Sequence, residues 1–288
     1  MLGMIVLVGS VSLPFVVVQS ARPEWVETAQ AETESLADRV WKALDIAAVM
    51  PILRDEAVAE AVDMAAQGLV TGGGRSWPST VAKVHDTDRL EALFRQGVAR
   101  AAASTDPSAL RAGLAFHESH LGQRLLRLEL AARRAMLDGE VETQARDGFV
   151  RALGRGDRRA QQILRLIDEA DLVAPNVAGA LNASLAFSRG FEQGGGFDMP
   201  LSDSQLLAET WAQRDQIEAE ATDWLRAYLL LSYSSLHDDE MEAYIAYTSS
   251  REGKVVAQVL FDAFDQMLRQ TSFDLGMAAA LRMQGREL

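Results

Sequence analysis

From Leu36 onward, apolar residues recur at spacings of three and four, which is the helical period. Alternating strand patterns are nearly absent, and no Asn-Gly pair marks a hairpin. The pattern predicts an all-α fold in which two tandem pseudo-repeats of about five helices each pack into a helical bundle. We place the first repeat at residues 36–138, the second at 160–270, and a C-terminal helix or tail at 271–288.

The first repeat is predicted to contain five helices. Pro51 either ends a first helix or lies in the first turn of the next helix. The pair Asp106-Pro107 is typical of a helix N-cap followed by a first-turn proline, and Ser119 is placed to cap the fifth helix. The predicted helices cover residues 36–50, 52–69, 79–104, a short stretch after Pro107, and a stretch after Ser119 that Asp138-Gly139 closes.

The second repeat is predicted to start near Ala160, and its Val173-Ala174-Pro175 echoes Val49-Met50-Pro51. A helical pattern then runs from about residue 202 towards residue 235. Some 30 residues would span roughly 45 Å, so we expect a break or a bend within this helix. Helices capped by Asp238 and Ser250 follow.

Large apolar residues repeat at helical spacing along the pattern between residues 202 and 235. They are Leu207, Trp211, Ile217, Trp224, Tyr228 and Leu231. We expect Trp211, Trp224, Tyr228 and Tyr233 to lie in the core, because side chains at this spacing share one buried face of a helix. A ligand groove lined by these aromatic residues is the alternative.

One motif occurs twice, at an offset of 131 residues between Gly122 and Gly253. Each copy has an aromatic residue, a serine three positions later and a glycine three positions after that. Residue type is kept at every aligned pair around the motif, which indicates a duplication. Leu110, Leu114, Phe116, Ser119, Gly122, Leu125, Leu128 and Met136 align with Met241, Ile245, Tyr247, Ser250, Gly253, Val256, Val259 and Met267.

The motif has a structural interpretation in both copies. A serine at a helix start satisfies backbone N–H groups that have no partner within the helix. Glycine in a helix costs about 1 kcal/mol relative to alanine. Its recurrence at Gly122 and Gly253 therefore predicts that another helix, or the aromatic side chain of Phe116 or Tyr247, approaches the backbone closely. A ligand contact is the alternative role of the motif.

The second copy, residues 246–254, reads Ala-Tyr-Thr-Ser-Ser-Arg-Glu-Gly-Lys. It resembles the bacterial domain-of-unknown-function family numbered twenty fifty-nine, whose members carry a Phe-Tyr-x-Ser-Pro-x-Gly-Lys-like core. Arg251 stands where that family often has proline. The resemblance covers residues 205–270 well and residues 79–138 loosely. It implies two tandem copies in an exported helical protein of unassigned function, and it supplies no catalytic residue.

The N-terminus is typical of a targeting segment. Residues 2–18 are almost wholly apolar and carry no charge, and small residues around Ser20 suit a signal-peptidase cut after it. No basic residue precedes the apolar run, so the true start lies upstream or the segment is an atypical anchor. We predict that residues 1–20 are a signal peptide for export to a bacterial periplasm. An uncleaved anchor in the inner membrane and a buried core helix are the alternatives.

Composition narrows the range of partners. The net charge of −13 disfavours nucleic acid and anionic lipid, because both are recognised by clustered cationic residues. We therefore expect no nucleic-acid partner, and membrane contact only through an uncleaved N-terminal segment. The chain has no cysteine, which excludes disulfides, thiolate metal sites and cysteine nucleophiles.

The stretch His117-Glu118-Ser119-His120 is the one candidate for metal binding. Its two histidines are three residues apart, whereas the zinc-protease motif separates them by four. The capping Ser119 lies between them, and the second copy has Thr248 and Arg251 at these positions. We interpret both histidines as ordinary surface residues and predict no catalytic, cofactor-binding or metal-binding residue.

Three functions remain open. The first is a non-enzymatic protein of the bacterial cell envelope that binds another protein or an envelope component. The second is a carrier of a small apolar ligand or lipid in a cavity between the repeats, and the third is an envelope hydrolase. An exposed apolar groove would favour the first function, an enclosed cavity the second, and a buried polar cluster the third.

Overall fold

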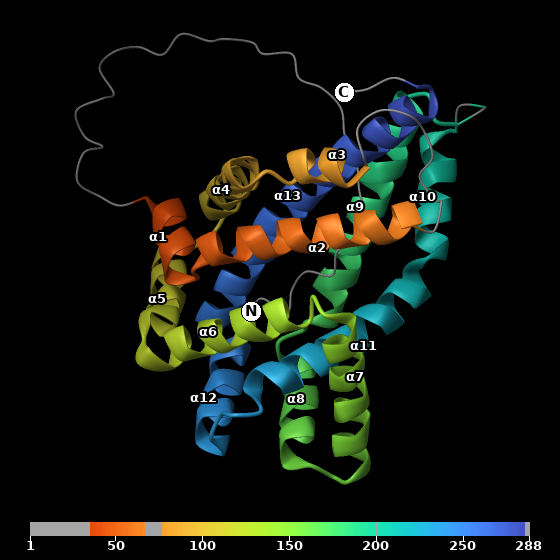
Figure 1. Cartoon of the computed structure of the whole chain (residues 1–288). Helices are drawn as coiled ribbons and strands as arrows, with labels where there is room; N and C mark the ends of the chain where they lie inside the picture. Colours follow the sequence, from red (N-terminus) through yellow and green to blue (C-terminus); the bar gives the residue numbers. More distant parts are fainter. Residues whose placement is uncertain (1–34, 67–76, 198, 200, 286–288) are drawn as a thin grey trace, which may run out of the picture.

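The computed structural model describes residues 35–66, 77–197, 199 and 201–285. Over these residues the protein contains thirteen α-helices and no strand, so the prediction of an all-α helical bundle is confirmed (Figure 1). The proposed signal segment at residues 1–20 lies outside the described residues. So do residues 286–288 of the predicted tail.

The helices follow one another through short connections. Their bounds are α1 Leu36–Ala43, α2 Ile46–Ala66, α3 Trp77–Val84, α4 Thr87–Ala103, α5 Pro107–Glu118, α6 His120–Ala135, α7 Gly139–Gly154, α8 Arg158–Glu169, α9 Val173–Gln193, α10 Asp203–Ala212, α11 Arg214–Tyr233, α12 Asp238–Ser249 and α13 Arg251–Met283.

Helix α13 is the element on which the bundle is built. It has 33 residues, and it packs along both α9 and α4 (Figure 1). The border that the sequence suggested between residues 270 and 271 falls inside this helix, so the C-terminal segment is not a separate helix. Thr271 and Ser272 are buried there, and the Thr271 hydroxyl bonds to the carbonyl oxygens of Met267 and Leu268 in its own helix. These polar residues therefore fit the helix interior without ending it.

The first predicted helix ends earlier than proline alone suggested. Helix α1 stops at Ala43, and the chain turns at Asp45, whose φ of 47° lies in the left-handed region. Pro51 then lies inside α2, where its exposed ring removes one hydrogen bond of the second turn and does not break the helix. The turn is made by the residues around Asp45, which carry no strong stop signal in the sequence.

Helix α7 connects the two predicted repeats and was missed in the sequence. Asp138 and Gly139 were interpreted as the close of the first repeat. In the structure the Asp138 side chain accepts a hydrogen bond from the Glu140 backbone N–H and begins the next helix. Helix α7 packs against α11 and buries Phe149 and Ala152. An aspartate followed by glycine is compatible with either a helix end or a helix start.

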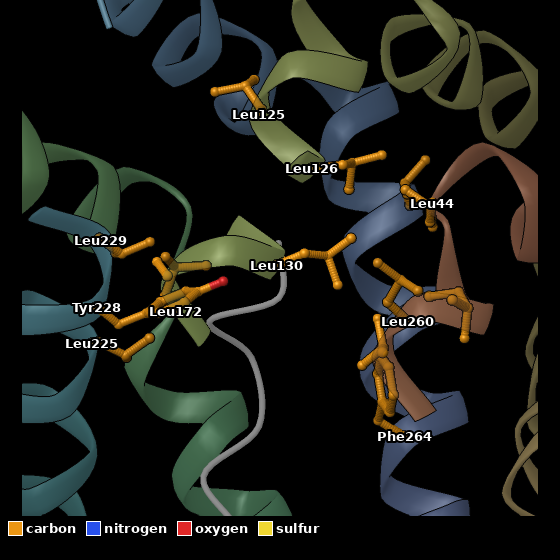
Figure 2. Close-up of a cluster of buried hydrophobic side chains, with 14 of the residues drawn as sticks. Leu44, Leu125, Leu126, Leu130, Leu172, Leu225, Tyr228, Leu229, Leu260 and Phe264 are labelled. Atoms are coloured by element: carbon orange, nitrogen blue, oxygen red, sulfur yellow. The ribbon is translucent and has the colours of Figure 1, made fainter. Parts of the chain in front are cut away.

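The largest core cluster draws apolar side chains from distant parts of the chain. Figure 2 shows leucines of α6, α11 and α13 directed into one interior, together with Leu44 and Leu172. Tyr228 and Phe264 join them and are fully or nearly fully buried. The predicted break in the long helix is also present, because α10 ends at Ala212 and α11 begins at Arg214.

Candidate functional site

The two copies of the repeated motif form the same local structure. Ser119 begins α6 and Ser250 begins α13, with φ and ψ of −70° and 163° at Ser119 and −70° and 161° at Ser250. Each serine hydroxyl accepts a hydrogen bond from the backbone N–H of the glycine, at 3.1 Å for Gly122 and 3.0 Å for Gly253. Each motif is therefore a tight corner at which one helix ends and the next begins.

The glycines lie where these corners leave no space. A Cβ on Gly122 would overlap the carbonyl oxygen of Phe116 and lie 2.5 Å from the Cα of His117. A Cβ on Gly253 would overlap the carbonyl oxygen of Tyr247. The close approach thus comes from the backbone of the preceding helix. A remote helix or an aromatic ring, as the sequence suggested, does not cause it.

The two corners also contact each other, through half-buried rings that pack against the core. The rings of Phe116 and Tyr247 stack with their centroids 3.8 Å apart and their planes 7° apart. The Tyr247 hydroxyl donates to the carbonyl oxygen of Gly113 in α5 at 2.9 Å. A Cβ on Gly113 would lie 2.6 Å from the carbonyl oxygen of Glu252, so α5 and the start of α13 are in close contact. These contacts give the motif a place in the packing of the bundle.

His117 is not a surface histidine, so that prediction is wrong. Its side chain is only 2% exposed, and its ring lies edge-on to Tyr247 with centroids 5.3 Å apart. Burial lowers the pKa of His117 to about 3, so the imidazole is neutral. His120 is exposed at the start of the next helix. In the part of the chain that the structure describes, no three His, Asp or Glu side chains gather as a metal ion would require.

A buried polar cluster lies beneath α6 and α11. The Tyr233 hydroxyl donates to the Glu129 carboxylate at 2.6 Å, and the Tyr228 hydroxyl donates to the Glu129 carbonyl oxygen at 3.2 Å. Arg133 donates to both carboxylate oxygens of Glu56 at 2.7 and 2.9 Å. Burial raises the pKa of Tyr228 and Tyr233 well above the ordinary value, so both phenols stay protonated. Glu129, Arg133 and the two tyrosines are packed inside the bundle, and Glu56 is half-buried at the border of the cluster.

An open apolar groove lies at the edge of the molecule between α9, α10 and α11, where Figure 1 shows α10 beside α9. Its volume is about 540 Å³, which falls in the range of pockets that bind small molecules or side chains of a partner. The lining residues are Asp171, Val173, Ala174, Val177, Ala178, Leu181, Asn182, Leu185, Leu207, Thr210, Trp211, Arg214 and Glu218.

Two large apolar side chains of α10 stand open to solvent at this groove. Trp211 is 61% exposed and Leu207 is 54% exposed, although the sequence predicted Trp211 in the core. Tyr228 and Tyr233 are buried as expected, and Trp224 packs partly buried against the core. Trp211 lies in α10 and the buried Tyr228 lies in α11, so the two side chains belong to separate helices and need not share one buried face.

The charged residues that line the groove are Asp171, Glu218 and Arg214. Arg214 pairs with Asp215 at 3.1 Å and with Glu218 at 2.8 Å, and its guanidinium carbon lies 6.0 Å from the centre of the Trp211 ring. The stretch from residue 203 to residue 226 contains six acidic residues and two arginines. The groove therefore combines an apolar lining with a net negative border.

Comparisons with protein-family models, with curated proteins and with solved structures return no match to this chain. The family resemblance of residues 246–254 accordingly stays a prediction. Among the helices of the described residues, none combines the length and the apolar character needed to cross a bilayer.

Proposed function

We propose that this protein is a non-enzymatic binding protein of the bacterial cell envelope, and that the groove between α9, α10 and α11 is its binding site. The observation that supports this function is the exposure of Trp211 and Leu207 at the border of an apolar groove. Large apolar side chains that gather at an open groove are typical of interaction sites. Binding an apolar surface there would remove both side chains from water.

The envelope location rests on the sequence. The uncharged apolar run over residues 2–18, followed by small residues around Ser20, supports export to the periplasm, with retention as an inner-membrane anchor as the alternative. N-terminal sequencing of the protein from its native host tests this location. A start near Ala21 to Pro23 is the expected result, and an intact N-terminus on a cytoplasmic species would contradict it.

We also propose that the chain is a tandem duplication related to the bacterial family numbered twenty fifty-nine. Helices α2 and α9 each have 21 residues, and each follows an aspartate with a φ of 47°, Asp45 before α2 and Asp171 before α9. The caps at Ser119 and Ser250 have nearly equal dihedral angles. Such agreement between distant segments supports a common origin of the two halves.

The two alternative functions have less support. A carrier would hold its ligand in a cavity between the repeats, whereas the groove is open and is lined by α9, α10 and α11 of the second half, with Asp171 just before α9. An envelope hydrolase would use a buried polar cluster such as the one around Glu129, but that cluster is packed among core side chains. The openness of the groove therefore favours partner binding.

Affinity capture from envelope extracts tests the proposed function. The exported protein, a groove variant with Leu207→Ala and Trp211→Ala, and a control variant with Val150→Ala and Leu153→Ala are used side by side. The control removes exposed apolar side chains from α7, away from the groove. Mass spectrometry of proteins and lipids should find a species that the parent and the control retain and the groove variant loses. Equal capture by all three chains would refute the groove as the site.

A further inference from the structure

We propose that the occupant of the groove is a positively charged amphipathic helix presented by a partner protein. This inference rests on the proposed function and names the partner by its chemistry. Three features of the described residues support it: the shape of the groove, the way the chain itself covers the short helix α3, and the charge around α10 and α11.

The shape suits a helix of about three turns. The apolar lining from α9 consists of Val173, Val177, Leu181 and Leu185, which recur every four residues. The twelve residue steps of helix from Val173 to Leu185 correspond to roughly 18 Å. A partner helix laid along this row presents apolar side chains at positions i, i+3 or i+4 and i+7, which is the usual way a helix fills an apolar groove.

The chain itself shows how a short helix of this bundle becomes enclosed. Helix α3 packs on α2 and also contacts α13, where Val81 and Val84 join Leu275, Met277 and Ala278 in one buried cluster. Helix α10 packs on α9 and contacts α11 only slightly. Helices α6 and α13 occupy the same place in the two halves, directly after the motif. Helix α13 has 33 residues and reaches α3, whereas α6 ends at Ala135 after only 16 residues. In this protein the exposed side of a short helix such as α3 is covered by another helix, so a helix is the element that would cover α10 in the same way.

The charge around the groove selects the sign of the partner. Between residues 203 and 226, α10 and α11 carry six acidic residues and two arginines. Asp203 and Glu220 among them pair with Arg189 and Arg146, so the net charge of these groups together is −2. Arg214 is engaged by Asp215 and Glu218, which reduces its availability for an anionic ligand. Opposite charges at the border of an interface increase the association rate and exclude partners of the wrong sign. An anionic lipid headgroup or an acidic peptide is therefore disfavoured, and lysine or arginine beside the apolar face of the partner helix is favoured.

Fluorescence anisotropy with designed peptides tests this inference. The probe is a labelled helix of about 18 residues with leucines on one face and lysines beside them. Two further peptides replace the lysines by glutamates or scramble the order of the same residues. The full chain should bind the lysine peptide, and should bind each of the others at least about tenfold more weakly. Raising the salt from roughly 50 to 500 mM should weaken binding of the lysine peptide, because exposed charges are screened.

Variants of the chain locate the binding. The groove variant Leu207→Ala with Trp211→Ala should lower the affinity for the lysine peptide at least about tenfold, as loss of central aromatic contacts does at interfaces. The control Val150→Ala with Leu153→Ala should leave it unchanged. The charge variant Asp215→Asn with Glu209→Gln should reduce the salt dependence. Equal affinity of all variants for the lysine peptide would overturn the inference.

A neutral apolar dye, N-phenyl-1-naphthylamine, separates this inference from the proposed function. If the dye binds the parent but not the groove variant, and no lysine peptide competes with it, the groove binds apolar ligands and the cationic helix is wrong. If neither dye nor any peptide binds at the groove, both proposals fail. Preferential binding of vesicles of phosphatidylglycerol over the lysine peptide would also overturn the cationic-helix inference.

Discussion

The short helices α3 and α10 follow the two 21-residue helices α2 and α9, but only α3 is enclosed on both sides. Trp77 at the start of α3 is 4% exposed and belongs to a cluster that includes side chains of α13, whereas Trp211 near the end of α10 is 61% exposed. A tryptophan at helical spacing is thus buried or open according to whether a third helix reaches it. The groove lies in the second half because α13 covers α3, whereas α10 is left open beside α9 and α11.

The same two halves agree closely at the Ser119 and Ser250 corners. The corners depend on residues that lie within a few positions of each other, so each half forms them independently. The environments of α3 and α10 depend on the length of a distant helix.

Replacement of Trp77 in α3 and of Trp211 in α10 should give the largest difference in the free energy of unfolding. Trp77→Ala removes a buried aromatic side chain and should lower the free energy of unfolding by about 3–5 kcal/mol. Trp211→Ala removes an exposed one and should change it by less than about 0.5 kcal/mol. Urea denaturation followed by circular dichroism measures both values. Equal losses would mean that α10 is as enclosed as α3.

Alanine at the motif glycines should destabilise both corners alike. A Cβ at Gly122 or Gly253 overlaps a backbone carbonyl oxygen, so the preceding helix end must move. Overpacking of this kind costs about 1–3 kcal/mol. Leucine at either position should cost at least as much, because it adds further atoms to the same crowded space. Thermal unfolding of the single variants gives the comparison.

Gly148 in α7 is the matched control for these glycines, because a Cβ there would meet no atom within 4 Å. Gly148→Ala should raise the free energy of unfolding by up to about 1 kcal/mol, as alanine favours the helix over glycine. Alanine variants of Gly122 and Gly253 that both melt above the parent would contradict the close approach.

Acid should weaken the fold through the buried histidines. Burial lowers the pKa of His117 to about 3 and of His85 to about 4, below the ordinary value of 6.5. Above pH 6.5 both rings are neutral in the folded and in the unfolded chain. Below pH 6.5 the unfolded chain binds protons that the folded chain does not. The free energy of unfolding therefore decreases as the pH is lowered, by at most about 1.4 kcal/mol per pH unit for each histidine.

The comparison of His85 and His117 locates this effect. His85 directly follows α3, and His117 lies in the last turn of α5 at the first corner, so the two histidines report on two different parts of the first half. In urea titrations between pH 6.5 and 4.5, His117→Leu should reduce the pH slope of the free energy of unfolding, and His85→Leu should reduce it as well. An unchanged slope in His117→Leu would show that this ring is protonated in the folded protein.

Among the changes at the corners, loss of a capping hydroxyl should destabilise the protein least. Ser119→Ala and Ser250→Ala each remove the acceptor of a glycine N–H and should cost about 1 kcal/mol. Threonine at either position keeps the hydroxyl and should retain most of the stability. Thermal unfolding of the four variants tests this. A large difference between the two alanine variants would mean that the corners are not equivalent.

Much of the secondary structure was predictable because its signals are local. The all-α fold followed from apolar spacing, and the positions of the caps at Asp106, Ser119 and Ser250 followed from residue types near each helix start. The break before Arg214 followed from the length of the pattern. Helix α7 and the turn at Asp45 were missed, because an aspartate beside glycine and an aspartate in a left-handed turn give weak or ambiguous signals.

The sequence by itself determined the helical class, most helix starts and the crowding that makes glycine suitable at Gly122 and Gly253, since these depend on neighbours within about four residues. Only the tertiary structure decided which faces are covered. It stacked Phe116 on Tyr247, buried His117, and left Trp211 open at the groove. The physical reason is that burial depends on helices far away in the chain, and helical spacing indicates an apolar face without indicating what will cover it.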